Sequence, residues 1–427
     1  MIKKYVSTTI LVVMVILSLA LTVFIVWRPT SDVTNFETVP GSNVSSPRNN
    51  LSSEIIFSPV SVLKYNGIQP SRTQNKNLVA QANSMLVDQI DNVREDTEMD
   101  GKEFIDTDIF SGELQLEYDT ETPLSFTSLV SDDTGENTVI SIDRIVVPQE
   151  DSSEIYLVNT MQNKYYQADV TGDVIPDLFQ LVDSGDVFPV QYFVLKNGPQ
   201  YLPIEKTTLP EYTYLIEQEP VSFYIQELFD DTIDVRNRSS ESVAQYNDSR
   251  SELKIDLNTN IMTFRKNQLN QSTTDTNVLR DALNIVRRLD SWSGIFRYSG
   301  TVSQSQSAFT FRRYLESYPV FGEPDNGLMQ INMATGGPTF IQLSTKSIQI
   351  ELDEEQNNVS LVSGEELIGL LQTSGLKMDQ IENISIGYDW TTSEESSKVA
   401  KFTPKWFIKY NNIWRSLEDW QKSGGEG

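Results

Sequence analysis

Residues 278–302 read VLRDALNIVRRLDSWSGIFRYSGTV and contain the clearest secondary-structure signal in the chain. The apolar residues recur with the spacing of one helical face, at Val278, Leu279, Ala282, Ile285, Val286 and Leu289. Arg280, Asp281, Arg287 and Arg288 take the opposite face. This period predicts an amphipathic helix. Gly294–Val302 then predicts a strand, and further strands are expected at Ala308–Leu315, Gly327–Met333 and Thr339–Glu351.

The order of one helix followed by several strands recurs on both sides of this stretch. Upstream, a strand over Tyr212–Ile216 and a helix over Val221–Phe229 precede strands at Ile233–Arg238, Ser242–Tyr246, Glu252–Asp256 and Ile261–Arg265. Downstream, Ser363 and Glu366 form a capping box for a helix that ends at Gly375. Ile384–Trp390 then predicts a strand, and Asn411-Asn412 predicts a hairpin between Trp406–Tyr410 and Ile413–Leu417. Helices and strands in such runs favour an α+β fold with mostly antiparallel sheets.

The region 55–205 is richer in strands. Strands are predicted at Ile55–Leu63, Leu114–Tyr118, Val139–Val147 and Ile155–Val158, and a helix at Asn77–Ile90. We therefore expect three extracytoplasmic domains: an N-terminal one at 55–205, a central α+β domain at 206–275, and a C-terminal α+β domain at 276–427.

The N-terminus contains one long apolar stretch, Tyr5–Trp27, with no charged residue. As a helix it extends about 35 Å, which is enough to cross a bilayer core of about 30 Å. The stretch is longer than the apolar part of a cleaved signal peptide, which favours an uncleaved anchor. The positive-inside rule places residues 1–4 in the cytoplasm and the bulk of the chain outside the cell membrane. The expected interface anchors are Lys3, Lys4, Tyr5, Trp27 and Arg28.

One face of this predicted transmembrane helix is marked by hydroxyl residues. Spacings of three and four place the following residues together: Thr8, Leu11, Val15, Ser18, Thr22 and Ile25. Such a face suits contact with another membrane helix. The alternative is that the hydroxyls bond back to their own helix. Residues 28–54 follow as a flexible linker, because Ser, Asn, Thr and Pro make up 16 of these 27 residues.

The composition excludes several classes of function. The 427 residues contain 33 Lys+Arg against 60 Asp+Glu, a net charge of −27, which argues against a nucleic-acid partner. With no Cys and no His, the chain has no disulfide, no Cys- or His-dependent catalytic triad and none of the usual zinc ligands. We expect no metal and no cofactor.

The remaining chemical motifs are incomplete. Ser61-Val-Leu-Lys64 and Ser374-Gly-Leu-Lys377 match S-x-x-K, but no K-T-G partner exists. Asp106–Asp108 and Asp169–Asp173 miss the pattern of a calcium loop. A pair of carboxylates for glycoside hydrolysis stays open among 60 acids. The aromatic residues Trp390, Trp406, Tyr410, Trp414 and Trp420 favour a half-buried sheet over a carbohydrate platform.

Several stretches resemble one family in the right order. They are Val221–Arg236, Phe309–Phe321, Ile384–Tyr388 and Pro404–Tyr410, which with the N-terminal anchor resemble YycH proteins. The resemblance implies a non-enzymatic, single-pass regulator of an essential sensor histidine kinase of the WalK (YycG) type, which controls cell-wall metabolism. It also implies a YycI-type sister protein as partner and contacts made by the transmembrane helices. The alternative is an anchored extracytoplasmic binding module that senses a cell-wall ligand.

Overall fold

The computed structural model of the chain describes residues 52–67, 69–95, 113–130, 140–267, 277–289, 295–302, 307–352, 357–393 and 396–423. All of them belong to one compact unit, residues 48–427. Two large sheets dominate this unit, and the strand pairs are antiparallel apart from β18–β23. The prediction of mostly antiparallel sheets with a few helices is confirmed.

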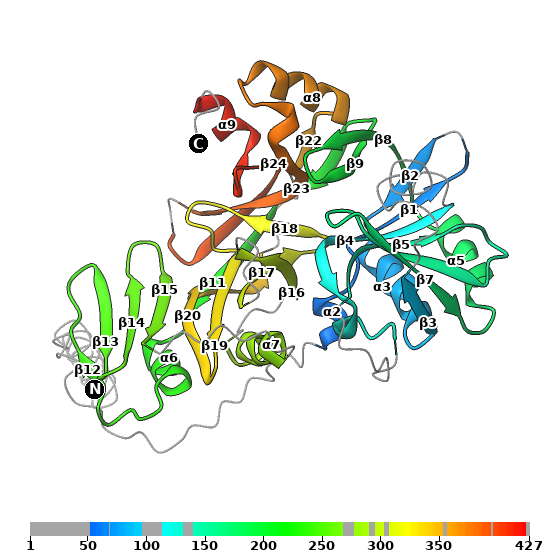
Figure 1. The fold of residues 1–427 in the computed structure, drawn as a ribbon. Helices are drawn as coiled ribbons and strands as arrows, with labels where there is room; N and C mark the ends of the chain where they lie inside the picture. Colours follow the sequence, from blue (N-terminus) through cyan, green and yellow to red (C-terminus); the bar gives the residue numbers. More distant parts are fainter. Residues whose placement is uncertain are drawn as a thin grey trace, which may run out of the picture. The chain divides into compact units, whose positions relative to one another are not determined.

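The first sheet has nine strands and occupies the N-terminal part of the unit (Figure 1). In spatial order its strands are β3 (Ile90–Glu95), β7 (Lys164–Val170), β6 (Glu154–Asn159), β5 (Ser141–Val147), β4 (Leu114–Pro123), β1 (Ser61–Tyr65), β2 (Pro70–Thr73), β8 (Phe188–Leu195) and β9 (Gly198–Pro203). Helices α3 (Lys76–Leu86) and α5 (Val174–Asp183) share a core with one face of the sheet. Leu114, Leu116 and Tyr118 point into that core, so Gln115 and Glu117 turn to the other face.

The second sheet has fourteen strands. Its main path is β12 (Arg236–Asn237), β13 (Val243–Asn247), β14 (Ser251–Asp256), β15 (Ile261–Lys266), β20 (Gly337–Ser344), β19 (Leu328–Ala334), β17 (Ala308–Leu315), β18 (Tyr318–Phe321), β23 (Ile381–Thr392), β24 (Val399–Tyr410), β11 (Tyr212–Gln218) and β21 (Lys346–Glu351). In addition, β16 (Ile295–Thr301) pairs with β17, and β25 (Ile413–Ser416) pairs with β24. Because β15 pairs with β20, the strands of ranges 206–275 and 276–427 share one sheet.

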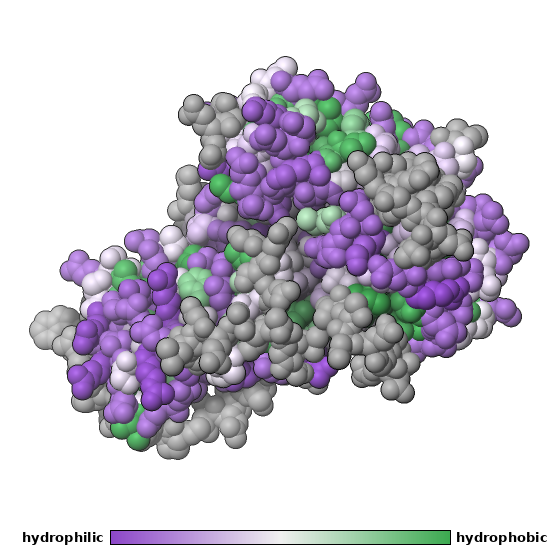
Figure 2. All heavy atoms as spheres, in the orientation of Figure 1, coloured by the Kyte–Doolittle hydropathy of each residue, from purple (hydrophilic) through white to green (hydrophobic). Residues whose placement is uncertain are grey.

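Helices cover this sheet in two places. Helices α6 (Val221–Leu228) and α7 (Asn277–Leu289) bury their apolar faces in one core. Helices α8 (Gly364–Thr373) and α9 (Leu417–Lys422) belong to a second core with β23 and β24. A separate pair of strands, β10 (Thr207–Pro210) and β22 (Asn358–Leu361), completes the fold with the short helices α2 (Ser53–Ile56), η1 (Leu124–Phe126) and η3 (Met378–Gln380). The face shown in Figure 2 is mainly hydrophilic, and apolar residues form only small separate patches on it.

Local sequence signals set several element ends as predicted. The Ser363 hydroxyl accepts a hydrogen bond of 3.3 Å from the Glu366 amide at the start of α8. Gly375 follows the end of this helix with a φ of +86°, which glycine adopts without strain. Asn411 and Asn412 have φ values of 51° and 62°, as the tight turn between β24 and β25 requires.

Three predicted strands were wrong or incomplete. Ile55–Phe57 is the end of a helical turn, because Ile56 and Phe57 are buried while Ile55 is 40% exposed. Ile233 is 88% exposed and precedes a strand of only two residues, so Ile233–Arg238 is mostly irregular. The predicted strand Thr339–Glu351 is two strands, since the chain leaves β15 and β19 near Thr345 and pairs next with β11.

Candidate functional site

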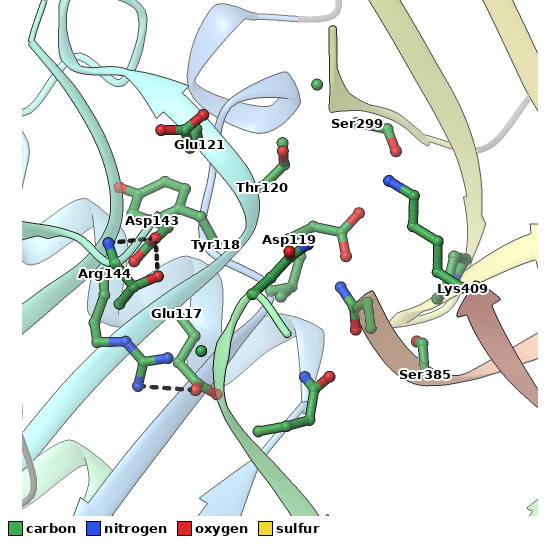
Figure 3. A pocket seen from close by; sticks show the side chains of 18 of the residues that line it. Glu117, Tyr118, Asp119, Thr120, Glu121, Asp143, Arg144, Ser299, Ser385 and Lys409 are labelled. Carbon is green, nitrogen blue, oxygen red and sulfur yellow. Dashed lines mark hydrogen bonds and ion pairs between the residues drawn. The ribbon is translucent and has the colours of Figure 1, made fainter. Parts of the chain in front are cut away.

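A cavity of about 880 Å³ lies between the two sheets. Strands β4, β5 and β9 supply one wall, and β16, β17, β23 and β24 supply the other. Figure 3 shows how carboxylate, hydroxyl and amine side chains from both walls point into it. A concave site at a boundary between two substructures is where small molecules usually bind.

An irregular stretch of β4 presents the acidic side chains to the cavity. The pairing of β4 with β5 shifts between Glu117 and Thr122, so Asp119, Thr120 and Glu121 lie in a bulge. Bulges re-aim side chains away from the regular alternation of a strand, and they are frequent beside binding sites. The bulge therefore separates the buried side chain of Glu117 from those of Asp119 and Glu121, which line the cavity and are partly buried.

The buried side chain of Glu117 belongs to a closed network of ions. Glu117 is 7% exposed and lies 3.3 Å from both Arg72 Nε and Arg144 Nη1. The Ser61 hydroxyl donates a 2.7 Å hydrogen bond to Glu117 and accepts one of 3.0 Å from Arg72. Burial alone would raise the pKa of Glu117, but the two arginines and the hydroxyl outweigh it and hold that pKa below its usual value.

This network also accounts for the first S-x-x-K match. Ser61 has no exposed surface, and its hydroxyl is engaged with Glu117 and Arg72. Lys64 turns away to form an ion pair with Asp183. The Ser61 hydroxyl and the Lys64 amine thus serve packing and ion pairing, which fits the rejection of an acyl enzyme from the sequence.

Asp119 connects the two walls. Burial raises the pKa of this carboxyl, and it does so against Arg312, the Tyr314 hydroxyl, Lys409 and Arg297, all of which belong to the second sheet and lower it. Figure 3 shows the Lys409 side chain extending toward Asp119. The carboxylate of one sheet is therefore held by a cluster of donors and cations from the other.

The third group is the pair Glu121 and Asp143. Asp143 Oδ2 accepts hydrogen bonds from the Thr160 amide, at 2.8 Å, and from the Thr160 hydroxyl. Its Oδ1 is buried without a hydrogen-bond partner among the described residues. Burial raises the pKa of Asp143 against the opposing effects of Arg144 and the Thr160 hydrogen bonds, and the charge of Glu121 adds to the rise. Glu121 accepts a 3.0 Å hydrogen bond from Gln162 Nε2.

A short segment ties the start of the described chain to the second sheet. Ile56 and Phe57 are each 1% exposed and belong to the core of α6 and α7. The Phe57 ring lies 5.0 Å from that of Phe126 and 5.1 Å from that of Tyr298. Arg297 Nη1 donates to the Ser58 and Pro59 carbonyls at 3.1 and 2.9 Å. Residues 56–59, which we call the plug, thus anchor the chain before it enters the first sheet.

The residues predicted to contact a membrane partner cannot be placed in this geometry. The transmembrane face Thr8–Ile25, the anchors Lys3, Lys4, Tyr5, Trp27 and Arg28, and most of the linker lie outside the described residues. None of the helices within the described ranges is long and apolar enough to cross a membrane. The described residues also contain no group of three or more carboxylates placed to hold a metal ion.

Sequence reasoning missed the cavity residues. The signal was present only in part, as the alternation of Gln115 and Glu117 with Leu114, Leu116 and Tyr118 along β4. The aromatic residues were interpreted correctly: Trp390, Trp406, Tyr410 and Trp420 are buried in the cores of the second sheet.

Comparison with known families covers almost the whole chain. Residues 4–184 match the model of the YycH protein N-terminal domain, and residues 197–424 match that of the YycH protein C-terminal domain. The chain belongs to the YycH family. Its fold is similar to the crystal structure of YycH from Bacillus subtilis, with a TM-score of 0.67 at 17% identity over 86% of this chain and 96% of that one. No curated protein matches the sequence.

The two YycH domains meet at the cavity. The gap between the matched ranges contains the whole of β8, and β9 follows at the start of the C-terminal YycH domain. Hairpin β8–β9 contacts both sheets, because Gln200 accepts a 2.9 Å hydrogen bond from the Ile384 amide while Arg72 donates to the Tyr201 carbonyl at 3.1 Å. The cavity is therefore enclosed by residues of both YycH domains and the hairpin that joins them.

Proposed function

We propose that this chain is a non-enzymatic, membrane-anchored regulator of a sensor histidine kinase of the YycG (WalK) type that controls cell-wall metabolism. It acts with a YycI-type sister protein, and its transmembrane helix makes the contact. The bulk of the chain lies outside the cell membrane. The match of both YycH domains along the chain is the observation that carries this proposal.

The plug supports a connection between anchor and body. Residues 56–59 follow the predicted linker directly, and Arg297, Phe126 and Tyr298 fix them in the compact unit. A change in the body can therefore reach the linker through these residues. A regulator of this kind acts if its helix binds the two states of the kinase with different affinity.

The test replaces hydroxyl residues of the predicted contact face in the full chain, with kinase output read from a reporter gene. Ser18→Ala or Thr22→Val alone should shift the ratio of kinase states about threefold, and both together about eightfold, since one hydrogen bond between membrane helices is worth about 0.6 kcal/mol.

The matched controls are Ser7→Ala and Thr9→Val, which remove hydroxyls from other faces of the same predicted helix. They should leave output unchanged at equal protein levels. Equal effects of both sets would reject the face. Full regulation by a chain released from the membrane would reject the transmembrane contact altogether.

A further inference from the structure

In one corner of the cavity, two carboxylates form no ion pair with another described residue, although Arg144 acts on one of them, Asp143, from a distance. Of the acidic residues that line it, Glu117 is paired with Arg72 and Arg144, and Glu382 lies 2.9 Å from Lys196 Nζ. Asp119 is surrounded by cations of the second sheet. Within the described ranges, Glu121 and Asp143 form no ion pair, and the charge of Glu121 adds to the rise in the pKa of Asp143 that burial causes.

The hydrogen bonding of Asp143 is a second, independent indication that a ligand binds here. Its Oδ1 is shielded from water and has no hydrogen-bond partner in the described part of the chain. A buried carboxylate oxygen in this state costs free energy. A cation in the neighbouring cavity would offset that cost, because its charge acts through the poorly screened interior.

The surroundings suit an organic cation better than a metal ion. No group of three or more carboxylates in the described ranges is placed to hold a metal ion. Tyr298 also lines the cavity, and it is close enough to Glu121 for that carboxylate to add to the rise in the tyrosine pKa that burial causes. A carboxylate beside an aromatic ring is a usual arrangement for binding an ammonium group. The volume of about 880 Å³ leaves room for a molecule attached to that group.

We propose that the cavity binds a small organic molecule through a primary ammonium group, which Glu121 contacts directly and the charge of Asp143 attracts. Gln162 orients Glu121 through its 3.0 Å hydrogen bond (Figure 3 shows Glu121 and Asp143 on the same wall). The remaining polar groups of the cavity, such as Ser299 and Thr120, are available for the body of the ligand. Binding at this site does not require the kinase, so its test is independent of the proposed regulatory function.

The test measures binding to the purified full chain in detergent, with two matched pairs of probes. One pair is D-glucosamine and N-acetyl-D-glucosamine, and the other is glycylglycinamide and its N-acetylated form. We expect at least one amine to bind at least tenfold more tightly than its acetylated counterpart in calorimetric titration. Binding of only the sugar amine or only the peptide amine supports the site and identifies the source of the ammonium group.

The variant Glu121→Gln should weaken amine binding about tenfold or more, and Asp151→Asn, an exposed acid outside the cavity, should not. Glu121 is only partly buried, so its variant is expected to unfold at the temperature of the wild type, which a melting curve checks. Acidification should weaken binding as Asp143 becomes protonated. Equal affinity for acetylated probes, binding of calcium chloride alone, or no binding of either amine at 10 mM, about the weakest useful affinity, would overturn the proposal.

Discussion

In two regions of the same cavity wall, the pKa values of buried carboxyls are shifted in opposite directions. At Glu117, two arginines and a hydroxyl compensate for burial, and the pKa of the carboxyl is lowered. At Asp143, one strand away, Arg144 and the Thr160 hydrogen bonds compensate burial only in part, and the pKa is raised. Burial thus raises the pKa of both carboxyls, and the partners of each decide the direction of the net shift. We therefore regard the Glu117 region as structural and the Asp143 region as a place for an external partner.

The largest expected effect is at Glu117. Glu117→Gln leaves Arg72 and Arg144 buried without a counter-charge, so the free energy of unfolding should fall by about 3–5 kcal/mol. Urea denaturation measures this change, and Glu150→Gln, at an exposed residue in the turn between β5 and β6, is the control with no expected effect. A loss below about 1 kcal/mol would mean that the arginines find other partners and that the two regions do not differ as described.

A smaller effect of opposite sign is expected at Asp143. Asp143→Asn keeps an oxygen that accepts the Thr160 hydrogen bonds and removes the incompletely compensated charge. At neutral pH the free energy of unfolding should stay equal or rise by up to about 1 kcal/mol. Urea titrations of both proteins give the difference, and a loss of stability would show that the charge is fully compensated after all.

The contributions of Asp143 and Glu117 to stability should also depend on pH in opposite directions. Because the folded-state pKa of Asp143 is raised, its ionised form is disfavoured, and this penalty disappears as pH falls through that pKa toward the ordinary value of 3.8. The wild type should therefore gain stability relative to Asp143→Asn on acidification from pH 7. Glu117 behaves conversely, since its contribution is present above its ordinary pKa of 4.5 and is lost when pH falls through the lowered folded-state value.

The smallest effect is expected at Lys409, which faces Asp119 across the cavity. Lys409→Met should lower the free energy of unfolding by about 0.2–1 kcal/mol, because the ammonium group is only partly buried and Asp119 keeps Arg312 and Arg297 nearby. The exposed Lys398→Met is the matched control. Identical denaturation curves for the two variants would show that Lys409 does not stabilise the contact between the sheets.

Local signals in the sequence predicted the elements that depend on local physics. The apolar face of Val278–Leu289, the turn at Asn411-Asn412 and the helix end at Gly375 were all correct, because each is decided by neighbouring residues. Ile55–Phe57 was wrong for the opposite reason. Ile56 and Phe57 are buried in a core shared with β16 and helices α6 and α7, which come much later in the chain, and no local pattern reveals that packing.

The cavity could not be predicted for a related reason. Asp119 and Lys409 are brought together only when the two sheets meet, and the charges of each look like ordinary surface charges in the sequence. Likewise, the bulge in β4 contains no glycine or proline from which it could be predicted. Only the family resemblance extended further, because it rests on the order of short stretches along the sequence and requires no knowledge of the contacts between them.

The plug has a consequence for the order in which the protein is made. Ile56 and Phe57 are synthesised early, yet the other buried residues of the core that they belong to begin at Ile216 and end at Phe402. During synthesis this core therefore stays incomplete until almost the entire chain has been made. The N-terminal part of a chain usually folds first during synthesis. Here its first buried residues are packed completely only after the last strands of the second sheet have been made.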